Sequence, residues 1–279
     1  SAPSYGTAQI TDKKLSVVWT HDIGAVSADG SYFPGAGWTG QPLLVKWPKA
    51  TKQAMKLPAA QVDDDGFVEV IYPVFDGSVY RLSLADGSVT RPKIEGKWGF
   101  KGTGSIDPRG YPLLYAGQGL NENGNQKGPW EYRIFDLIQN KQVSKISGAD
   151  EVSHRQDPVG WGAFDSSALI DRYSDTLIEP GENGIVYKAK LNASFDAKAG
   201  KVSVKPELTK MTYRSPVSRQ YGIESSAAAW KNLMWATDND GLMVCWDART
   251  LEVVWARTTG DNADSTPVLD DSTGHPYLY

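Results

Sequence analysis

Acidic and hydroxylated side chains recur together in this chain, and they are the residue types best suited to chemistry. The segments FDSSAL, IESSAA and ADSTPV each place an acidic residue before two hydroxylated residues and an apolar run. Aligning Asp165, Glu224 and Asp264 puts Thr103 and Thr39 in the same slot. Paired carboxylates can hydrolyse glycosides, and clustered carboxylate oxygens suit Ca²⁺. The same residues also cap turns, a structural role that the pattern fits at least as well.

The loops before this slot are rich in aromatic residues. Aromatic faces stack on sugars and other planar ligands, while nearby polar groups hydrogen-bond them. The candidate ligand-binding residues are therefore Thr39, Thr103, Asp165, Glu224, Asp264, Trp38, Trp98, His154, Trp161 and Tyr221. For a glycosidase, the candidate catalytic carboxylates are Asp165, Glu224 and Asp264, separated by about 5–5.5 Å for retention or roughly 6.5–9.5 Å for inversion.

Other catalytic signatures are missing from the sequence. His21, His154 and His275 are far apart, and neither a serine elbow nor a His-x-x-x-His pair is present. Cys245 is the single cysteine, which excludes an internal disulfide and a multi-thiolate metal site, and its apolar neighbours predict a buried side chain. The sequence favours a binding protein over an enzyme.

Composition indicates a folded protein of many short strands. The 279 residues are 40% hydrophobic and include 28 Gly and 16 Pro, which punctuate the chain densely. A net charge of −4 offers no broad basic surface, which argues against a nucleic-acid partner. No apolar run reaches the 18 or so residues of a spanning helix, so we expect no transmembrane segment.

The acidic slot begins a repeated unit of four strands, and we call the acidic residue with its two hydroxylated followers the start motif. Asp-Gly and Asn-Gly turns in VFDGSVYRL, GENGIVYKA and DNDGLMVCW predict hairpins between second and third strands. Alternating patterns in VYRLSLADGSVTRP, EYRIFDLIQNKQVSK, VYKAKLNASFDAKAGKVSV and MVCWDARTLEVVWAR predict the third and fourth strands. No long amphipathic helix is predicted.

Radial repeats of four-stranded units are typical of a β-propeller. We expect an all-β fold with one domain over 1–279 and about five blades of four antiparallel strands. A β-sandwich would not explain a repeated slot at five positions, three of them with the full start motif. LSVVWTH near the N-terminus matches LEVVWAR near the C-terminus, so one blade is expected to be shared between the two ends. The predicted blades are approximately 41–95, 105–147, 167–206, 226–258, and 266–279 joined with 6–20.

One repeat resembles a known family. WDARTLEVVW is similar to the Leu-Asp-Ala-x-Thr-Gly-Lys-x-x-Trp repeat of quinoprotein-like propellers, with weaker likeness in ITDKKLSVVW, FDLIQNKQVS and LSLADGSVTR. Those rings usually have seven or eight blades, so the resemblance also allows this chain to be part of a longer ring. Quinone-dependent dehydrogenases of the family use a vicinal cysteine pair, which one cysteine cannot supply. The resemblance therefore does not bring pyrroloquinoline quinone with it.

Three functions follow from these residues. The favoured one is a non-enzymatic binding or scaffolding propeller of the cell envelope or extracellular space, holding a protein partner or a glycan at its channel mouth or rim. The alternative is a carbohydrate-active enzyme of the glycoside hydrolase type, and the third is a quinone-dependent dehydrogenase. An extracellular or periplasmic location is expected from the family resemblance, the aromatic loops and an N-terminus that looks mature.

Overall fold

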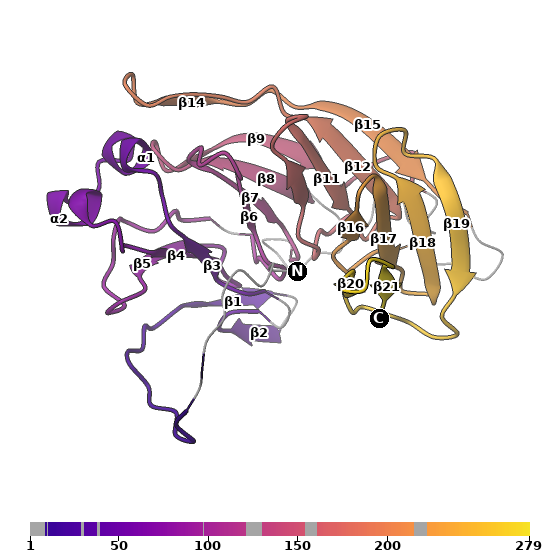
Figure 1. Ribbon diagram of the computed structural model, residues 1–279, viewed down its shortest axis with the longest axis horizontal. Helices are drawn as coiled ribbons and strands as arrows, with labels where there is room; N and C mark the ends of the chain where they lie inside the picture. Colours follow the sequence, from indigo (N-terminus) through magenta and orange to yellow (C-terminus); the bar gives the residue numbers. More distant parts are fainter. Residues whose placement is uncertain are drawn as a thin grey trace.

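The computed structural model describes residues 9, 11–28, 31–37, 40–96, 98–120, 130–153, 161–214 and 222–279. Short antiparallel sheets follow one another along the chain and fan around a common centre (Figure 1). Each of the three- and four-stranded sheets is one blade. This layout confirms the all-β propeller architecture that the repeated start motif predicts.

Three four-stranded blades occupy the middle of the chain. The second blade consists of β6 (Ser105–Ile106), β7 (Leu113–Gly117), β8 (Glu131–Asp136) and β9 (Lys141–Ser147). The third consists of β10 (Leu169–Asp171), β11 (Thr176–Pro180), β12 (Ile185–Lys190) and β15 (Glu207–Thr212). The fourth consists of β16 (Ala228–Trp230), β17 (Leu233–Thr237), β18 (Leu242–Asp247) and β19 (Val253–Thr258). Every neighbouring pair within these blades is antiparallel, as hairpin connections require.

The apolar core lies between the blades. Because strand side chains alternate between two faces, each blade packs one face against the preceding blade and the other against the next. On β12, Tyr187 belongs to the cluster shared with the second blade, and Val186 belongs to the cluster shared with the fourth. The backbones also approach closely, since a Cβ added at Gly148 would lie 1.9 Å from the Gly162 carbonyl oxygen. The blades therefore stack face to face and leave their first strands around the centre.

The first blade departs from the predicted four strands. It contains β3 (Leu43–Val45), β4 (Glu69–Pro73) and β5 (Val79–Ser83). Where VTRP was expected to lie in a fourth strand, only the isolated bridges Leu82 to Val89 and Val79 to Ile94 form. Pro92 lies between these bridges and has no N–H to donate, so the ladder is interrupted there.

Two short helices are inserted into the first blade between β3 and β4. They are α1 (Lys49–Ala54) and α2 (Ala59–Asp63). The buried Lys52 ammonium joins them, because it donates to the carbonyl oxygens of Gln61 at 2.9 Å and Asp64 at 2.7 Å. Each helix spans fewer than two turns, which is too short for an amphipathic period to be read from the sequence.

The third blade carries an insertion that corrects the predicted range 167–206. Residues expected to form its fourth strand form a separate hairpin of β13 (Ser194–Asp196) and β14 (Lys201–Ser203), and the fourth strand is β15. The hairpin buries one face, where Phe195 lies 5.6 Å from the Tyr111 ring. Alternation alone could not distinguish an inserted hairpin from a blade strand, because both have the same period.

The two ends of the chain do not pair with each other among the described residues. β20 (Leu269–Asp270) and β21 (Tyr277–Leu278) form a two-stranded sheet, and residues 11–20 contain no strand. Trp19 instead donates its indole N–H to the Leu84 carbonyl oxygen at 2.9 Å and packs over Gly87, where any Cβ would clash with the ring. The predicted sheet joining 266–279 with 6–20 is therefore not formed by the residues of these two segments that the structure describes. A further hairpin, β1 (Ala25–Ala28) with β2 (Ser31–Pro34), lies outside the predicted blades.

Candidate functional site

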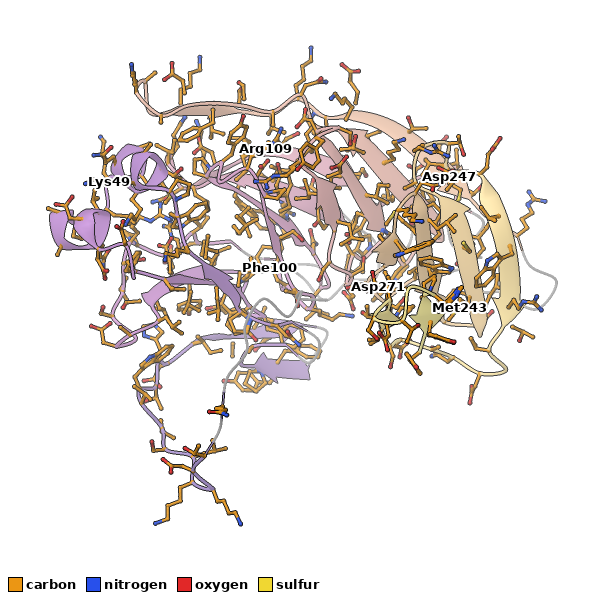
Figure 2. All side chains as sticks on the ribbon, in the orientation of Figure 1. Lys49, Phe100, Arg109, Met243, Asp247 and Asp271 are labelled. Carbon is orange, nitrogen blue, oxygen red and sulfur yellow. The ribbon has the colours of Figure 1, made fainter. Side chains whose placement is uncertain are left out.

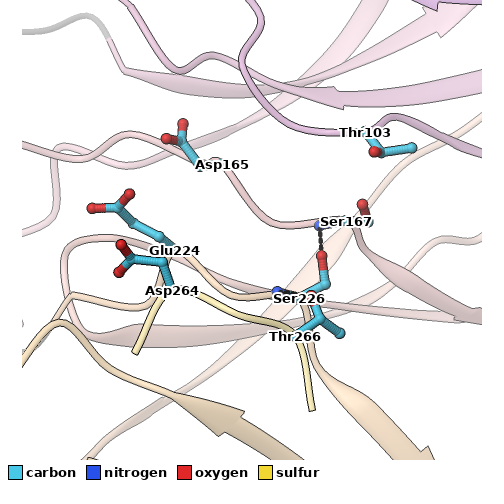
Figure 3. A pocket seen from close by; sticks show the side chains of 7 residues that line it. All are labelled: Thr103, Asp165, Ser167, Glu224, Ser226, Asp264 and Thr266. Carbon is cyan, nitrogen blue, oxygen red and sulfur yellow. Dashed lines mark hydrogen bonds between the residues drawn. The ribbon is translucent and has the colours of Figure 1, made fainter. Parts of the chain in front are cut away.

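The start motifs of successive blades meet at a central cavity of about 250 Å³. Asp165, Glu224 and Asp264 gather on one side of it, as expected for side chains in one slot of a radial repeat (Figure 3). The remaining lining residues are hydroxylated: Thr103, Ser167, Ser226 and Thr266. Asp165 is buried, Glu224 is half-buried and Asp264 is exposed, so the solvent exposure of the three carboxylates increases from Asp165 to Asp264.

The last hydroxyl of each start motif links neighbouring blades. The Ser167 amide donates to Ser226 Oγ at 2.9 Å, and the Ser226 amide donates to Thr266 Oγ1 at 3.1 Å (Figure 3). Earlier in the ring, the Gln41 amide donates to Thr103 Oγ1 at 2.9 Å. These hydroxyls satisfy backbone amides that would otherwise be unpaired at the channel wall.

The first hydroxyl of the motif binds within its own blade. Ser166 Oγ lies 2.6 Å from Glu179 Oε1 and 2.7 Å from the Pro180 carbonyl oxygen. Ser225 Oγ donates to the Thr237 carbonyl oxygen and accepts the Thr237 amide, both at 3.0 Å. The structural interpretation of the motif therefore holds for both hydroxylated positions, and only the acidic position faces the channel without a backbone to cap.

The acidic position contacts a lysine and a second carboxylate that the sequence did not single out. Lys101 Nζ lies 2.6 Å from Asp165 Oδ2 and 3.9 Å from Glu182 Oε1, and the Lys101 and Asp165 side chains are 7% and 1% exposed. Trp161 donates its indole N–H to Glu182, and Asn239 donates to Glu224 Oε1 at 2.8 Å. One oxygen each of Asp165, Glu182 and Glu224 lies within 4.8 Å of the others. We call these three carboxylates with Lys101 the acidic cluster.

Burial raises the pKa values of the carboxyl groups in the acidic cluster. Removal from water raises the pKa of Asp165 despite the neighbouring Lys101 ammonium. Burial and the Asp165 carboxylate raise the pKa of Glu182 well above its usual range, and the same two causes raise the pKa of Glu224. Burial opposes the charge on Lys101, but Asp165 and Glu182 outweigh it and raise the pKa of the ammonium. The cluster therefore keeps its cation, and its carboxyl groups lose their protons at higher pH than free carboxyl groups do.

This arrangement limits which cofactor fits. The cluster has the carboxylate oxygens that Ca²⁺ requires, but the Lys101 ammonium already lies among them as a cation. Pyrroloquinoline quinone is itself an anionic carboxylate and would meet the carboxylates of the channel mouth with like charge. Cys245, the single cysteine, is buried on β18, away from the cavity lining. The channel residues do not fit this quinone.

The predicted aromatic residues that the structure describes do not line the cavity. Trp98 stacks on Arg133, whose guanidinium carbon lies 3.5 Å from the ring centroid. Trp161 packs on Trp130 with centroids 4.7 Å apart in addition to its bond to Glu182. Both rings therefore hold polar partners and neighbouring loops in place. Of the other predicted residues, Trp38, Thr39, His154 and Tyr221 lie outside the described residues.

Lys101 and Glu182 are the site residues that sequence reasoning missed. Glu182 occupies the β11–β12 hairpin at the position that Asn239 occupies in the next blade, since the Glu182 and Asn239 amides donate to equivalent carbonyls of Ala163 and Gly222. Alignment of the GENG and DNDG turns would have found this pair. Thr103 accepts the Gln41 amide just as Ser226 and Thr266 accept amides, so it occupies the last hydroxylated position of the motif and not the acidic slot to which the sequence alignment assigned it. Lys101, two residues earlier, therefore occupies the acidic slot of the second blade, and the alignment missed it because it was two residues out of register there.

Comparison with known proteins supports the fold. No protein-family model matches the sequence, and no curated protein matches it significantly. The chain resembles Sqt1 of Saccharomyces cerevisiae with a TM-score of 0.50 at 10% identity, over 74% of this chain and 48% of that one. It is a β-propeller. Because the identity is so low, the likeness shows the fold alone.

Two further solved structures show weaker likeness. BamB from Moraxella catarrhalis has a TM-score of 0.47 at 13% identity, over 75% of this chain and 51% of that one. A chain of the Mitotic Checkpoint Complex has a TM-score of 0.45 at 15% identity, over 72% and 50%. The propeller chain thus spans about half the length of the structures it matches. Among its described helices, none is long and apolar enough to cross a membrane.

Proposed function

We propose that this chain is part of a binding propeller that holds a ligand or partner at the acidic mouth of its central channel. The observation that carries the proposal is the 250 Å³ cavity whose lining residues are all carboxylates or hydroxyls, contributed by four successive blades. Cavities where polar groups from several elements converge are the usual binding sites of proteins.

The contacts of the lining residues indicate which ligand fits. Ser226 Oγ and Thr266 Oγ1 each accept a backbone amide, so their own hydrogens remain to donate toward the cavity. The opposite side offers carboxylate acceptors from Glu224 and Asp264. A ligand that both donates and accepts hydrogen bonds, such as a glycan or a basic side chain of a protein partner, matches these two sides.

The surroundings of Asp165 fit a role in a binding site better than a role as a catalytic nucleophile. Asp165 is held by Lys101 at 2.6 Å and is almost fully enclosed, so its carboxylate has neither the freedom nor the exposure that a nucleophile needs. Its contacts instead position Lys101 and the channel wall between the second and third blades.

A glycoside hydrolase is the second candidate, and Glu224 is the residue that favours it. Its side chain is half-buried, its pKa is raised by burial and by Asp165, and it lies at the cavity beside Asp264. A carboxyl group with a raised pKa beside a second carboxylate is the kind of pair that glycosidic hydrolysis uses.

The two candidates are separated by one pair of substitutions at the cavity. Glu224→Gln and Asp264→Asn should each weaken binding of hits from a glycan array or a basic-peptide library by about tenfold, roughly 1.4 kcal/mol, with no turnover by the native protein. Asp271→Asn, an exposed carboxylate of the β20–β21 turn, is the matched control and should leave affinity unchanged. Hydrolysis of an aryl glycoside that Glu224→Gln abolishes would establish the enzyme instead.

We also propose that the protein works outside the cytoplasm, in the cell envelope or extracellular space. This proposal depends on the resemblance of WDARTLEVVW to quinoprotein-like repeats. Recovery of the protein in the periplasmic or secreted fraction of its native host is the expected result, and recovery only in the cytoplasmic fraction would contradict it.

A further inference from the structure

A second charged cavity lies on the first blade, where the fourth strand is interrupted. From Val79 to Leu82, β5 spans three steps, whereas the opposing bridge residues Ile94 and Val89 are five steps apart. The surplus residues bulge around Pro92, which cannot donate to the ladder. A cavity of about 180 Å³ remains, lined by His21, Tyr80, Arg81, Leu82, Val89, Arg91 and Lys93.

The cavity wall contains three permanent cations and no carboxylate. Arg91 is paired with Glu69 at 3.2 Å, and Lys93 lies 3.8 Å from Glu95. Arg81 forms no ion pair with any described residue, although it is only 1% exposed. Of the three cations, Arg81 alone lacks a counter-ion among the described residues.

The Arg81 guanidinium donates only to neutral oxygens, and one of its N–H groups has no described partner. One terminal nitrogen donates to Asn140 Oδ1 at 2.5 Å, and the other donates to the Pro92 carbonyl oxygen. Nε is buried without a partner in the described part of the chain. An unpartnered donor on a buried cation is costly, and buried charges in proteins are normally paired.

Arg81 cannot escape this cost by losing its proton at neutral pH. Burial, with repulsion from Arg91, lowers the pKa of the Arg81 guanidinium to about 9, and Glu69 opposes the shift. The group therefore remains a cation at pH 7. Lys93 adds a second positive charge above the Tyr80 ring, with Nζ 5.5 Å from the centroid.

We propose that this cavity is a binding site for a small oxyanion, of the phosphate, sulfate or carboxylate class, with Arg81 as its counter-ion and Lys93 at its rim. A guanidinium presents several N–H donors in a fixed plane, which matches two oxygens of one anion. The site is independent of the channel mouth, because its lining residues belong to the first blade and the segment that packs on it.

The test is a titration of the full chain with inorganic phosphate, sulfate or acetate, each at ionic strength matched with chloride, followed by thermal unfolding and calorimetry. We expect at least one oxyanion to bind saturably and raise Tm above the chloride reference. The preferred anion assigns the source, since acetate points to a carboxylate and phosphate to a phosphorylated ligand. Equal Tm values in all four salts would overturn the proposal.

Two lysines make the test specific, and neither is buried. Lys93→Gln should weaken the oxyanion Kd about tenfold, equivalent to about 1.4 kcal/mol. Lys231→Gln is the matched control, because Lys231 also lies over an aromatic ring, 4.0 Å from the Trp230 centroid on the fourth blade. Arg81→Gln should abolish binding where it folds. Equal weakening by both lysine variants, or no weakening by Lys93→Gln, would refute a site at this cavity.

Discussion

The acidic cluster at the channel mouth and the Arg81 cavity on the first blade bury charge in opposite ways. Lys101 supplies a cation to the acidic cluster, and burial raises the pKa values of its carboxyl groups, which makes them easier to protonate. Arg81 has neither an ion-pair partner in the described chain nor a pKa low enough to become neutral at pH 7. Carboxyl groups can adapt to burial by protonation, whereas a guanidinium needs an anion.

The largest effect is expected from removing the anion beside the two arginines. Glu69 is fully buried and accepts from Trp47 Nε1 at 2.7 Å and Thr90 Oγ1 at 2.6 Å in addition to its ion pair with Arg91. Glu69→Ala should lower the free energy of unfolding by about 3–5 kcal/mol, because it leaves the buried Arg91 guanidinium without its carboxylate. Urea unfolding at pH 5 and pH 8 should show a similar loss at both.

Glu69→Gln keeps the size and most hydrogen bonds of this side chain and removes only its charge. It should therefore still destabilise the protein, by about 1.5–3 kcal/mol, the range for groups hydrogen-bonded to a charge. A Glu69→Gln variant as stable as the native protein would show that Arg91 does not depend on this anion, and the contrast between the two regions would fail.

A smaller and pH-dependent effect is expected at the acidic cluster. Lys101→Met removes the ammonium, so the carboxyl pKa values rise further and the folded state holds more protons than the unfolded state above about pH 4. Stability is then lost as pH rises, and we expect a deficit of about 1 kcal/mol at pH 5 and about 3 kcal/mol at pH 8. A pH-independent deficit would contradict adaptation by protonation.

The effect of Ca²⁺ on Tm should differ between the native protein and Lys101→Met. Because Lys101 lies among the cluster oxygens, Ca²⁺ should change the Tm of the native protein little. In Lys101→Met, one oxygen each of Asp165, Glu182 and Glu224 within 4.8 Å of the others should bind Ca²⁺ and recover part of the lost stability at pH 8. Stabilisation of the native protein by Ca²⁺ would instead show that the ammonium does not occupy the site.

Glu179 is a buried carboxyl group that forms no ion pair with a described residue, so its substitution tests the effect of a raised pKa alone. It is fully buried, and burial raises its pKa well above the usual range despite the bond from Ser166. A raised folded-state pKa makes stability fall as pH rises above the unfolded value of about 4.3. Glu179→Gln should therefore match the native protein near pH 4 and exceed it by about 1 kcal/mol at pH 8 in urea unfolding. A steeper pH dependence in the variant would reverse the assigned direction.

The smallest effect is expected at the uncharged links between blades. Ser226→Ala removes the acceptor of the Ser167 amide at 2.9 Å and should cost about 1 kcal/mol of unfolding free energy. Ser272→Ala, on an exposed turn, is the control and should cost less than about 0.5 kcal/mol. Equal losses in the two variants would remove the proposed role of the start-motif hydroxyls.

Much of the blade layout was predictable because its signals are local. Alternating side chains and Asn-Gly or Asp-Gly turns predicted the hairpins between second and third strands in the first, third and fourth blades, where Gly77, Gly184 and Gly241 adopt positive φ. The broken fourth strand at Pro92 and the inserted hairpin β13–β14 were not predicted. Both depend on which neighbour a strand pairs with, which alternation does not specify.

Side chains of neighbouring strands and blades crowd together between the ribbons (Figure 2). Contacts between residues far apart in sequence made the site only partly predictable. The sequence identified Asp165, Glu224 and Asp264 as equivalent, and equivalence in a radial repeat is enough to bring them to one channel. It did not identify Lys101, which joins the acidic cluster because the loop before the second blade passes beside the start of the third. It also assigned Trp98 and Trp161 to ligand stacking, but in the structure they hold Arg133 and Glu182.

The sequence by itself determined the repeat, the fold class and the ring of start motifs, because strand period, turn chemistry and residue spacing are properties of neighbouring residues. Only the tertiary structure decided what each part of the motif does. In FDSSAL, Ser166 binds its own blade, Ser167 donates to the next, and Asp165 meets Lys101 at the channel. It also decided which charges are compensated, since burial and the distance between residues far apart in sequence set both the raised pKa of Asp165 and the lack of an ion pair at Arg81 among the described residues.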